Sequence, residues 1–343
     1  MLGQRKRRKV STTENNKPPF IDPATEKAQN KPLLRLMSLP VFSDEKELAE
    51  VMHVDFRLIR KFCGGQKYFY RRYTIPKSNG KRREILQPCK DLKALQSWIL
   101  RNILDRLAPT PYATAYVKDK NLLHNVSPHS ANRYFLCLDL EDFFPSISDG
   151  RVANIFRLIG YSWRAAFFLS ALCTCDGGLP QGAVTSPALS NLVAAKLDRR
   201  IAGFTSRRNI VYTRYADDIT LSSNNPARLC RAMHTIICII ENERFKVNAE
   251  KTRVVGPRRR CRITGLVKNT DEPRFGIGRC KKRQMRAVMH ALLIKGKTDR
   301  KYDSADSILG WLSFLKGVDA VSYEQMNRTW ENLIRKSTPP STV

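Results

Sequence analysis

Short apolar runs separated by polar turns occupy the first two thirds of the chain, and they predict β-strands. Runs of this length, bounded by Gly, Asn or Asp, are typical of strands rather than helices. The run 210–212 is followed closely by the run 219–221, a spacing that predicts a β-hairpin. The turn Lys-Ser-Asn-Gly at 77–80 predicts a second hairpin. The predicted strands are 68–76, 83–86, 136–140, 210–212 and 219–221.

Apolar residues at three- and four-residue spacing predict helices elsewhere. Ser43 is the expected N-cap of the first helical segment, with Lys46 and Glu47 in its first turn. Ser186 is a second expected N-cap, because Pro187 follows it at the first helical position. The other predicted helices are 91–107, 151–159, 163–173, 191–201, 227–244, 279–294 and 307–317.

Acidic residues stand at the ends of two predicted strands. Asp217 and Asp218 lie in the hairpin turn, within the sequence Y-A-D-D, and Asp139 lies near the end of 136–140. Carboxylates held side by side repel each other unless a cation lies between them, and Mg²⁺ prefers oxygen ligands. Three carboxylates, with the backbone carbonyl of Leu140, suit two Mg²⁺ ions about 3.5–4 Å apart, as in phosphoryl transfer. Y-A-D-D alone is explained equally well by an ordinary acidic turn.

The chain is strongly basic. Its 61 lysines and arginines exceed its 31 acids and give a net charge of +30. Such an excess destabilises a compact chain unless a polyanion neutralises it, and nucleic acid is the expected one. A basic membrane-surface protein is the competing class, but no strong amphipathic helix or apolar run of about 18 residues supports it. Nine scattered cysteines suit a reducing cytosol.

Three motifs occur in a characteristic order. D-L-x-D-F-F-P-S begins at Asp139, L-P-Q-G-x-x-T-S-P covers 179–187, and Y-A-D-D covers 215–218. Together they resemble the palm of a reverse transcriptase from the bacterial group II intron and retron branch. The resemblance implies an α+β right-hand polymerase with fingers, a palm of antiparallel sheet plus helices, and a small α-helical thumb. The implied divisions are a basic, largely disordered extension (1–42), fingers with part of the palm (43–135), palm (136–270) and thumb (271–343).

The resemblance also implies roles for single residues. Asp139, Asp217 and Asp218 are the expected catalytic residues and, with Leu140, the expected ligands of two Mg²⁺ ions, which Mn²⁺ can replace. Phe144 is expected beneath the nucleotide sugar, where it would collide with a 2′-hydroxyl. Cations of the G-K-x-R pattern would clamp the triphosphate, and the lysine of N-x-x-K-T would protonate pyrophosphate. The expected nucleotide-binding residues are Lys81, Arg83, Phe144, Gln181, Gly182 and Lys251.

Two segments favour the retron group. N-V-S-P-H at 125–129 stands where retron enzymes carry N-A-x-x-H, and I-T-G at 263–265 stands where they carry V-T-G. Both elements are implied to contact structured RNA. Taken alone, the histidine is more simply a core or surface residue and the Thr-Gly pair a turn. The residues implied to bind RNA are Asn125, His129, Ile263, Thr264 and Gly265.

The function implied by the resemblance is that of a retron RNA-directed DNA polymerase in the bacterial cytoplasm. It would use deoxynucleoside triphosphates to copy part of an msr-msd type noncoding RNA into single-stranded DNA, primed from an RNA 2′-hydroxyl. A separate effector protein in antiphage defence is the further expected partner, and no membrane is expected. A group II intron protein is expected to carry maturase or endonuclease regions after the thumb. The alternatives are another bacterial reverse transcriptase (diversity-generating, abortive-infection or group II intron type) and a non-catalytic RNA-binding protein with a damaged metal site.

Overall fold

The computed structural model describes residues 29–76, 80, 82–269, 272–294 and 304–337. Helices and antiparallel sheets alternate along these residues, which gives the α+β architecture that the sequence predicts. The strands are β1 (Tyr70–Pro76), β2 (Arg82–Pro88), β3 (Tyr134–Asp139), β4 (Val211–Tyr215), β5 (Asp218–Ser223), β6 (Arg253–Val255), β7 (Arg262–Ile263), β8 (Leu266–Lys268) and β9 (Phe275–Gly276).

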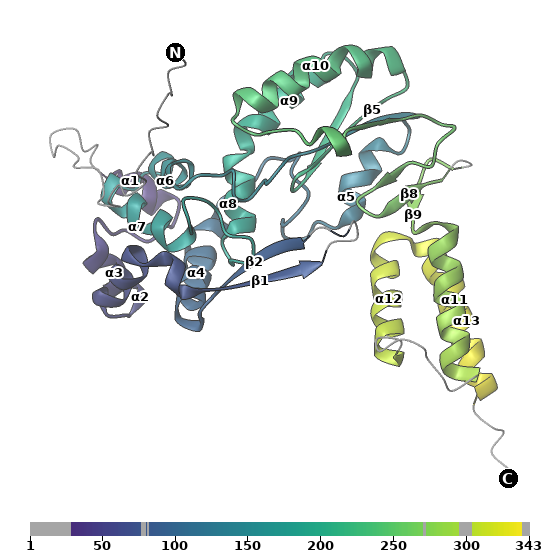
Figure 1. Ribbon diagram of the computed structural model, residues 1–343, viewed down its shortest axis with the longest axis horizontal. Coiled ribbons are helices and arrows are strands. Elements are labelled where there is room, and N and C mark those ends of the chain that lie inside the picture. The colour runs from purple at the N-terminus through teal and green to yellow at the C-terminus, as the bar shows by residue number, and fades with distance from the viewer. Residues whose placement is uncertain (1–28, 77–79, 81, 270–271, 295–303, 338–343) are drawn as a thin grey trace, which may run out of the picture.

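Three groups of helices surround these strands (Figure 1). The first are α1 (Lys31–Leu36), α2 (Glu45–Met52), α3 (Phe56–Gly64), α4 (Lys90–Asn102), α6 (Asp149–Leu158) and α7 (Trp163–Cys173). The second are α5 (Leu122–Val126), α8 (Ser186–Val193), α9 (Ala195–Ser206) and α10 (Pro226–Asn242). The third are α11 (Gly278–Ile294), α12 (Ala305–Val318) and α13 (Ala320–Ser337). Short 3₁₀ turns are η2 (Gln66–Phe69), η3 (Leu104–Arg106), η4 (Ser127–His129) and η5 (Ala249–Lys251).

The N-terminal helices pack into the main hydrophobic core. Leu34 of α1 and Phe42 have no exposed surface and pack in the same core as the helices α6 and α7. The folded part of the chain therefore begins before residue 42, earlier than the predicted end of the basic extension. Residues 1–28 of the predicted extension lie outside the described residues. The β1–β2 hairpin leaves this core and projects toward the side that carries α12 (Figure 1).

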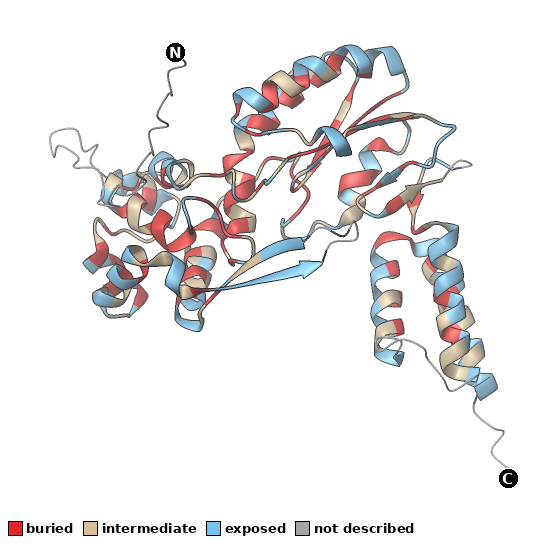
Figure 2. Cartoon of the chain, in the orientation of Figure 1, coloured by how far each residue is buried: buried red, intermediate tan, exposed pale blue. Residues whose placement is uncertain are grey.

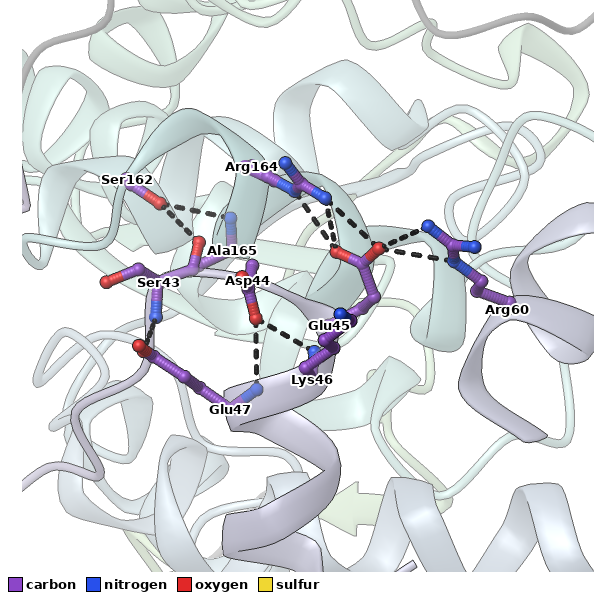
Figure 3. Close-up of polar contacts among 9 residues, drawn as sticks. All are labelled: Ser43, Asp44, Glu45, Lys46, Glu47, Arg60, Ser162, Arg164 and Ala165. Atoms are coloured by element: carbon purple, nitrogen blue, oxygen red, sulfur yellow. Dashed lines mark hydrogen bonds and ion pairs between the residues drawn. The ribbon is translucent and has the colours of Figure 1, made fainter. Parts of the chain in front are cut away.

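The N-cap of α2 is Asp44, one residue after the predicted Ser43. The Asp44 carboxylate accepts hydrogen bonds from the backbone N–H groups of Lys46 and Glu47, at 2.8 and 3.0 Å (Figure 3). The Ser43 backbone N–H donates instead to the Glu47 carboxylate at 2.7 Å. Both groups satisfy helix N-terminal donors, as in a capping box shifted by one residue.

Glu45 is a buried carboxylate that joins three helices. Its side chain is 1% exposed and lies between Arg60 of α3 and Arg164 of α7, at 2.8 and 2.9 Å (Figure 3). Burial raises the pKa of Glu45, but backbone and arginine hydrogen bonds outweigh it and hold the pKa below its ordinary value. The ion pairs therefore fix α2 against α3 and α7 as long as Glu45 is ionised.

The central sheet has four antiparallel strands in the order β4-β5-β3-β6. Its strands are largely buried (Figure 2), and α9 and α10 pack against it. In the β3–β5 register Asp139 lies directly opposite Asp218. The fold thus places carboxylates from two strands side by side at one end of the sheet.

The three C-terminal helices form a second unit. Their buried faces share one hydrophobic core with the β7-β8-β9 sheet and with Phe135 and Val255 of the central sheet. Their outer faces are largely exposed (Figure 2). The sequence predicts α11 and α12 but does not single out α13.

Three predicted helix boundaries are wrong. The predicted helix 191–201 is two helices, because the chain turns at Ala194 between α8 and α9. Ser186 is the first residue of α8 rather than its N-cap, and its hydroxyl donates to the Pro180 carbonyl at 2.8 Å. The predicted helix 91–107 ends at Asn102, before η3.

Candidate active site

A two-residue turn joins β4 to β5 and carries the acidic pair. Ala216 and Asp217 form the turn, and Asp218 is the first residue of β5. Ala216 is buried and has φ of +57°, a conformation uncommon for a residue other than glycine. The Arg214 guanidinium donates to the Ala216 carbonyl at 3.1 Å and so holds the turn from inside the protein.

Three carboxylates meet at this turn. Asp139 lies opposite Asp218 in the sheet register, and the Leu140 N–H donates to the Asp217 carbonyl at 3.0 Å. Burial, then the charges of Asp217 and Asp139, raise the pKa of Asp218 to about 6. Burial and the Asp139 charge also raise the pKa of Asp217. The site stores electrostatic repulsion that a cation would relieve.

Lys251 supplies a positive charge at the site. Its Nζ lies 2.7 and 2.8 Å from the two oxygens of Asp139, and the three carboxylates raise its pKa although burial lowers it. The sequence placed this lysine at the triphosphate, whereas the structure pairs it with Asp139. Among the described residues, no three His, Cys, Asp or Glu side chains are already gathered as a metal-binding group. The donor set nevertheless fits Mg²⁺, since it consists of hard carboxylate oxygens whose charges repel one another.

A buried polar network lies beneath the hairpin. Arg214 and Asp198 are fully buried and form a bidentate ion pair at 2.7 and 2.8 Å. Tyr212 and Thr110 donate their hydroxyls to the two oxygens of Asp198, at 2.7 and 2.5 Å. Arg214 also donates to Asn191 of α8 at 3.2 Å. Both carboxylate oxygens of Asp198 therefore have hydrogen-bond partners, as a buried charge requires.

Two of the predicted nucleotide-binding residues, Arg83 and Phe144, have described surroundings that bear on the site. Arg83 is exposed on β2, and its charge opposes the rise in the pKa of Asp217 that burial causes, so the guanidinium acts electrostatically on Asp217. Phe144 is half-buried, with its ring centroid 5.5 Å from that of Phe143. Lys81 lies outside the described residues.

Gln181 and Gly182 lie against the β1–β2 hairpin. The Gln181 carbonyl accepts the Leu86 N–H at 2.9 Å. Gly182 has φ of +130°, and a Cβ there would lie 2.8 Å from the Leu86 carbonyl oxygen. The glycine is therefore required for the close approach of two backbones in the protein, a reason the sequence does not reveal.

Asn125 and His129, predicted to contact RNA, are fully buried. His129 bonds to Ser222 and Thr213 at 2.6 and 2.8 Å, and burial lowers its pKa to about 3. Asn125 accepts the Thr213 hydroxyl at 2.7 Å and donates to Thr264 at 3.3 Å. Neither side chain reaches the surface, so the prediction of direct RNA contact is corrected. Both residues position the strands and turns around them.

The β7–β8 hairpin brings its turn to the catalytic site. Thr264 and Gly265 form this turn, with φ of +44° and +90°. Thr264 lines a recess of about 50 Å³ together with Asp139, Asp218 and Lys251. Thr264 is half-buried and Gly265 is exposed, whereas Ile263 is buried. Ile263 and Thr264 therefore line the recess beside the carboxylates, and Gly265 is exposed next to it.

Four residues that shape the site were missed in the sequence. Asp198, Arg214, Thr213 and Tyr116 lie in segments without motif chemistry, and their roles depend on tertiary contacts. The one available signal was an arginine inside the apolar strand before Y-A-D-D, since a charge in such a strand is buried only when paired.

The described helices include none with the length and apolar character needed to cross a membrane.

Known proteins resemble this chain over most of its length. The family described as reverse transcriptase (RNA-dependent DNA polymerase) matches residues 75–268. The retron Ec86 reverse transcriptase of Escherichia coli is 37% identical over 295 residues, which cover 85% of this chain and 90% of that protein. The retron Mx65 reverse transcriptase of Myxococcus xanthus is 31% identical over 326 residues, covering 89% and 73%. The retron Mx162 reverse transcriptase of the same organism is 34% identical over 281 residues, covering 73% and 58%.

Proposed function

The chain belongs to the reverse transcriptase family as a retron-type enzyme, and we propose that it copies part of a structured noncoding RNA into single-stranded DNA. RNA-directed DNA polymerisation is the activity of this family. The observation that carries the proposal is that Asp139 and Asp218, the residue after Asp217, lie opposite each other at one end of the central sheet and beside Thr264.

The three carboxylates, with the Leu140 carbonyl, would hold two Mg²⁺ ions, or Mn²⁺ in their place. When bound, such ions activate a primer hydroxyl and stabilise the charge of the transferred phosphoryl group. The network beneath the hairpin fixes the carboxylates, since Arg214 holds the Ala216 carbonyl. Lys251, which is paired with Asp139, would protonate the leaving pyrophosphate.

The nucleotide would bind between the β1–β2 hairpin and the acidic turn. Arg83, with Lys81, would attract its triphosphate, because fixed cations stabilise charge that they already face. Gln181 and Gly182 would border the pocket, and Phe144 would exclude a 2′-hydroxyl. In the right-hand description, residues 43–135 are the fingers, 136–270 the palm and 271–343 the thumb.

The partners of the protein follow from the retron assignment. The RNA would be of the msr-msd type and would prime synthesis from an internal 2′-hydroxyl, which leaves the DNA attached to it. The net charge of +30 supports a polyanionic partner such as RNA. We place the enzyme in the bacterial cytoplasm, with a separate effector protein in antiphage defence.

A homopolymer assay tests the polymerase assignment without knowledge of the natural RNA. Purified protein would be given poly(rA) annealed to oligo(dT), dTTP and Mg²⁺. The wild type is expected to extend the primer, and Asp217→Asn is expected to lose extension while binding the same duplex. Asp306→Asn is the matched control, since Asp306 is an exposed carboxylate at the start of α12.

Two results would speak against the proposal. Extension by Asp217→Asn at the wild-type rate would remove the metal assignment. A wild-type protein that binds the duplex but never extends it, with either Mg²⁺ or Mn²⁺, would favour the non-catalytic RNA-binding alternative.

A further inference from the structure

Tyr116 is an exposed aromatic residue in a strained backbone conformation beside the catalytic turn. Its φ is +58°, and 53% of its surface is exposed. Large side chains adopt this conformation at a cost of about 1–3 kcal/mol, and they retain it where the surrounding structure fixes it, often at functional sites. The contacts of the segment around Tyr116 must therefore hold its backbone in this conformation.

The segment before Tyr116 is fixed by the same buried network that holds the catalytic turn. Asn191 donates to the Ala115 carbonyl at 2.8 Å, and it accepts from Arg214 at 3.2 Å. The Thr114 N–H donates to the Arg214 carbonyl at 2.9 Å. Arg214 therefore positions both the Ala216 carbonyl in the turn and, through Asn191, the backbone that presents Tyr116.

The Tyr116 ring lies beside Phe144, one of the expected nucleotide-binding residues. Its ring centroid is 6.3 Å from that of Phe144, with the two planes at 51°. Burial raises the pKa of the Tyr116 hydroxyl, the charge of Asp217 raises it further, and the charge of Arg83 lowers it. The phenol thus lies within electrostatic reach of both the acidic turn and the β2 arginine, the two groups between which the nucleotide would bind.

We propose that Tyr116 is a nucleotide-contacting residue that forms, with Phe144, a two-ring wall around the sugar of the incoming deoxynucleoside triphosphate. This assignment rests on the proposed polymerase function. Tilted aromatic pairs at this separation attract each other beyond their burial of apolar surface. Tyr116 therefore limits the movement of the Phe144 ring, and sugar selection depends on both rings. Asn191 is a positioning residue for this wall.

Three substitutions separate the role of the ring from that of the backbone. On poly(rA)·oligo(dT), Tyr116→Ala is expected to raise the KM for dTTP about tenfold and to lower discrimination between dTTP and UTP about tenfold, because part of the sugar contact is lost. Tyr116→Phe keeps the ring and is expected to stay within about threefold of wild type in both quantities. Tyr116→Gly is expected to behave like Tyr116→Ala, with a Tm no lower than that of wild type, since glycine adopts positive φ without strain.

Tyr68→Ala is the matched control, because Tyr68 is also exposed but lies in η2 at the base of the β1–β2 hairpin. It is expected to leave KM and sugar discrimination unchanged. If Tyr116→Ala keeps the wild-type KM and discrimination while Phe144→Ala loses discrimination, the Tyr116 assignment is overturned and the polymerase proposal stands. If the wild type itself incorporates no dTTP, both are overturned together.

Discussion

Two β-hairpins border one recess, and they differ in how they are held and in what they offer. The β4–β5 turn carries Asp217 and Asp218 and is supported from below by a fully buried arginine. The β7–β8 turn carries Thr264 and Gly265 and belongs to a two- and three-residue strand pair over the C-terminal helical core. One turn supplies acidic ligands on a rigid base. The β7–β8 turn presents backbone groups and the Thr264 hydroxyl, and only two residue pairs join its strands.

Asn125 connects the two hairpins. It accepts a hydrogen bond from Thr213 of β4 and donates one to Thr264. We propose a division of labour between the two hairpins, with the chemistry at the β4–β5 turn and RNA positioning at the β7–β8 turn. Asn125 is the first residue of the N-V-S-P-H segment, which the resemblance associates with RNA. Although it is fully buried, it acts on the β7–β8 turn through its hydrogen bond to Thr264.

The largest expected effect is the loss of a carboxylate from the rigid turn. Asp218→Asn should lower kcat by about a thousandfold or more, because a metal ligand stabilises several kcal/mol of transition-state charge. The dissociation constant for poly(rA)·oligo(dT) should stay near the wild-type value. Primer extension and filter binding measure the two quantities. An equal loss of binding would show that the turn also positions the duplex, and the division of labour would fail.

Removal of the buried arginine should have the next largest effect, on stability. Arg214→Met removes the charged partner of the buried Asp198 and should lower the free energy of unfolding by about 3–5 kcal/mol. Neutralising the partner as well, with Asp198→Asn, should recover part of the loss. Urea denaturation of both variants measures this. Arg72→Met, at an exposed ion pair with Asp176, is the control and should change stability little. A similar loss in the control would remove the special role of the buried pair.

Asn125→Ala should affect both hairpins. It leaves buried hydroxyls of Thr213 and Thr114 without one acceptor, at a cost of about 1–3 kcal/mol in the free energy of unfolding. It also removes the bond to Thr264, so the affinity for poly(rA)·oligo(dT) should fall. Asn327→Ala, on the α13 surface, is the control. If Asn125→Ala lost stability but kept full affinity, the asparagine would support β4 alone.

The buried His129 predicts a pH dependence. Its folded pKa of about 3 lies below the ordinary value of 6.5, so the unfolded chain binds the proton first and stability falls as pH drops below 6.5. His129→Asn removes this contribution, whereas Asp218, with a pKa of about 6, titrates in both proteins. The stability advantage of wild type over the variant should therefore shrink by about 2 kcal/mol between pH 8 and pH 5. A constant difference in urea denaturation would mean that His129 is not held neutral.

The smallest expected effect is that of a substitution at Thr264 in the β7–β8 turn. Thr264→Asn should raise the free energy of unfolding by about 0.5–1 kcal/mol, because asparagine tolerates positive φ better than a β-branched residue. The affinity for poly(rA)·oligo(dT) should nevertheless fall, since the threonine hydroxyl at the recess is replaced. Thermal denaturation and filter binding measure both. A more stable variant with unchanged affinity would show that the Thr264 hydroxyl does not contribute to binding of the duplex.

Local chemistry explains which features could be predicted from the sequence. The Y-A-D-D hairpin, the Asp139 strand and the β1–β2 hairpin follow from short apolar runs and turn residues, and the structure confirms them. The burial of Asn125 could not be predicted, and that of His129 was one of the alternatives left open, because polar residues in a motif are equally compatible with a ligand contact and with internal hydrogen bonds. The pairing of Arg214 with Asp198 joins a strand to a helix 16 residues earlier, and that of Lys251 with Asp139 joins residues 112 apart. Neither pairing leaves a periodic signal.

The central claim is that the enzyme synthesises DNA on an RNA to which that DNA stays attached. The most direct test is to purify the protein from its native host and sequence the nucleic acid that copurifies, with and without RNase treatment. The account predicts a short single-stranded DNA covalently joined to a structured RNA, absent when the host carries Asp218→Asn. Bound RNA with no attached DNA in the wild type would contradict the retron function.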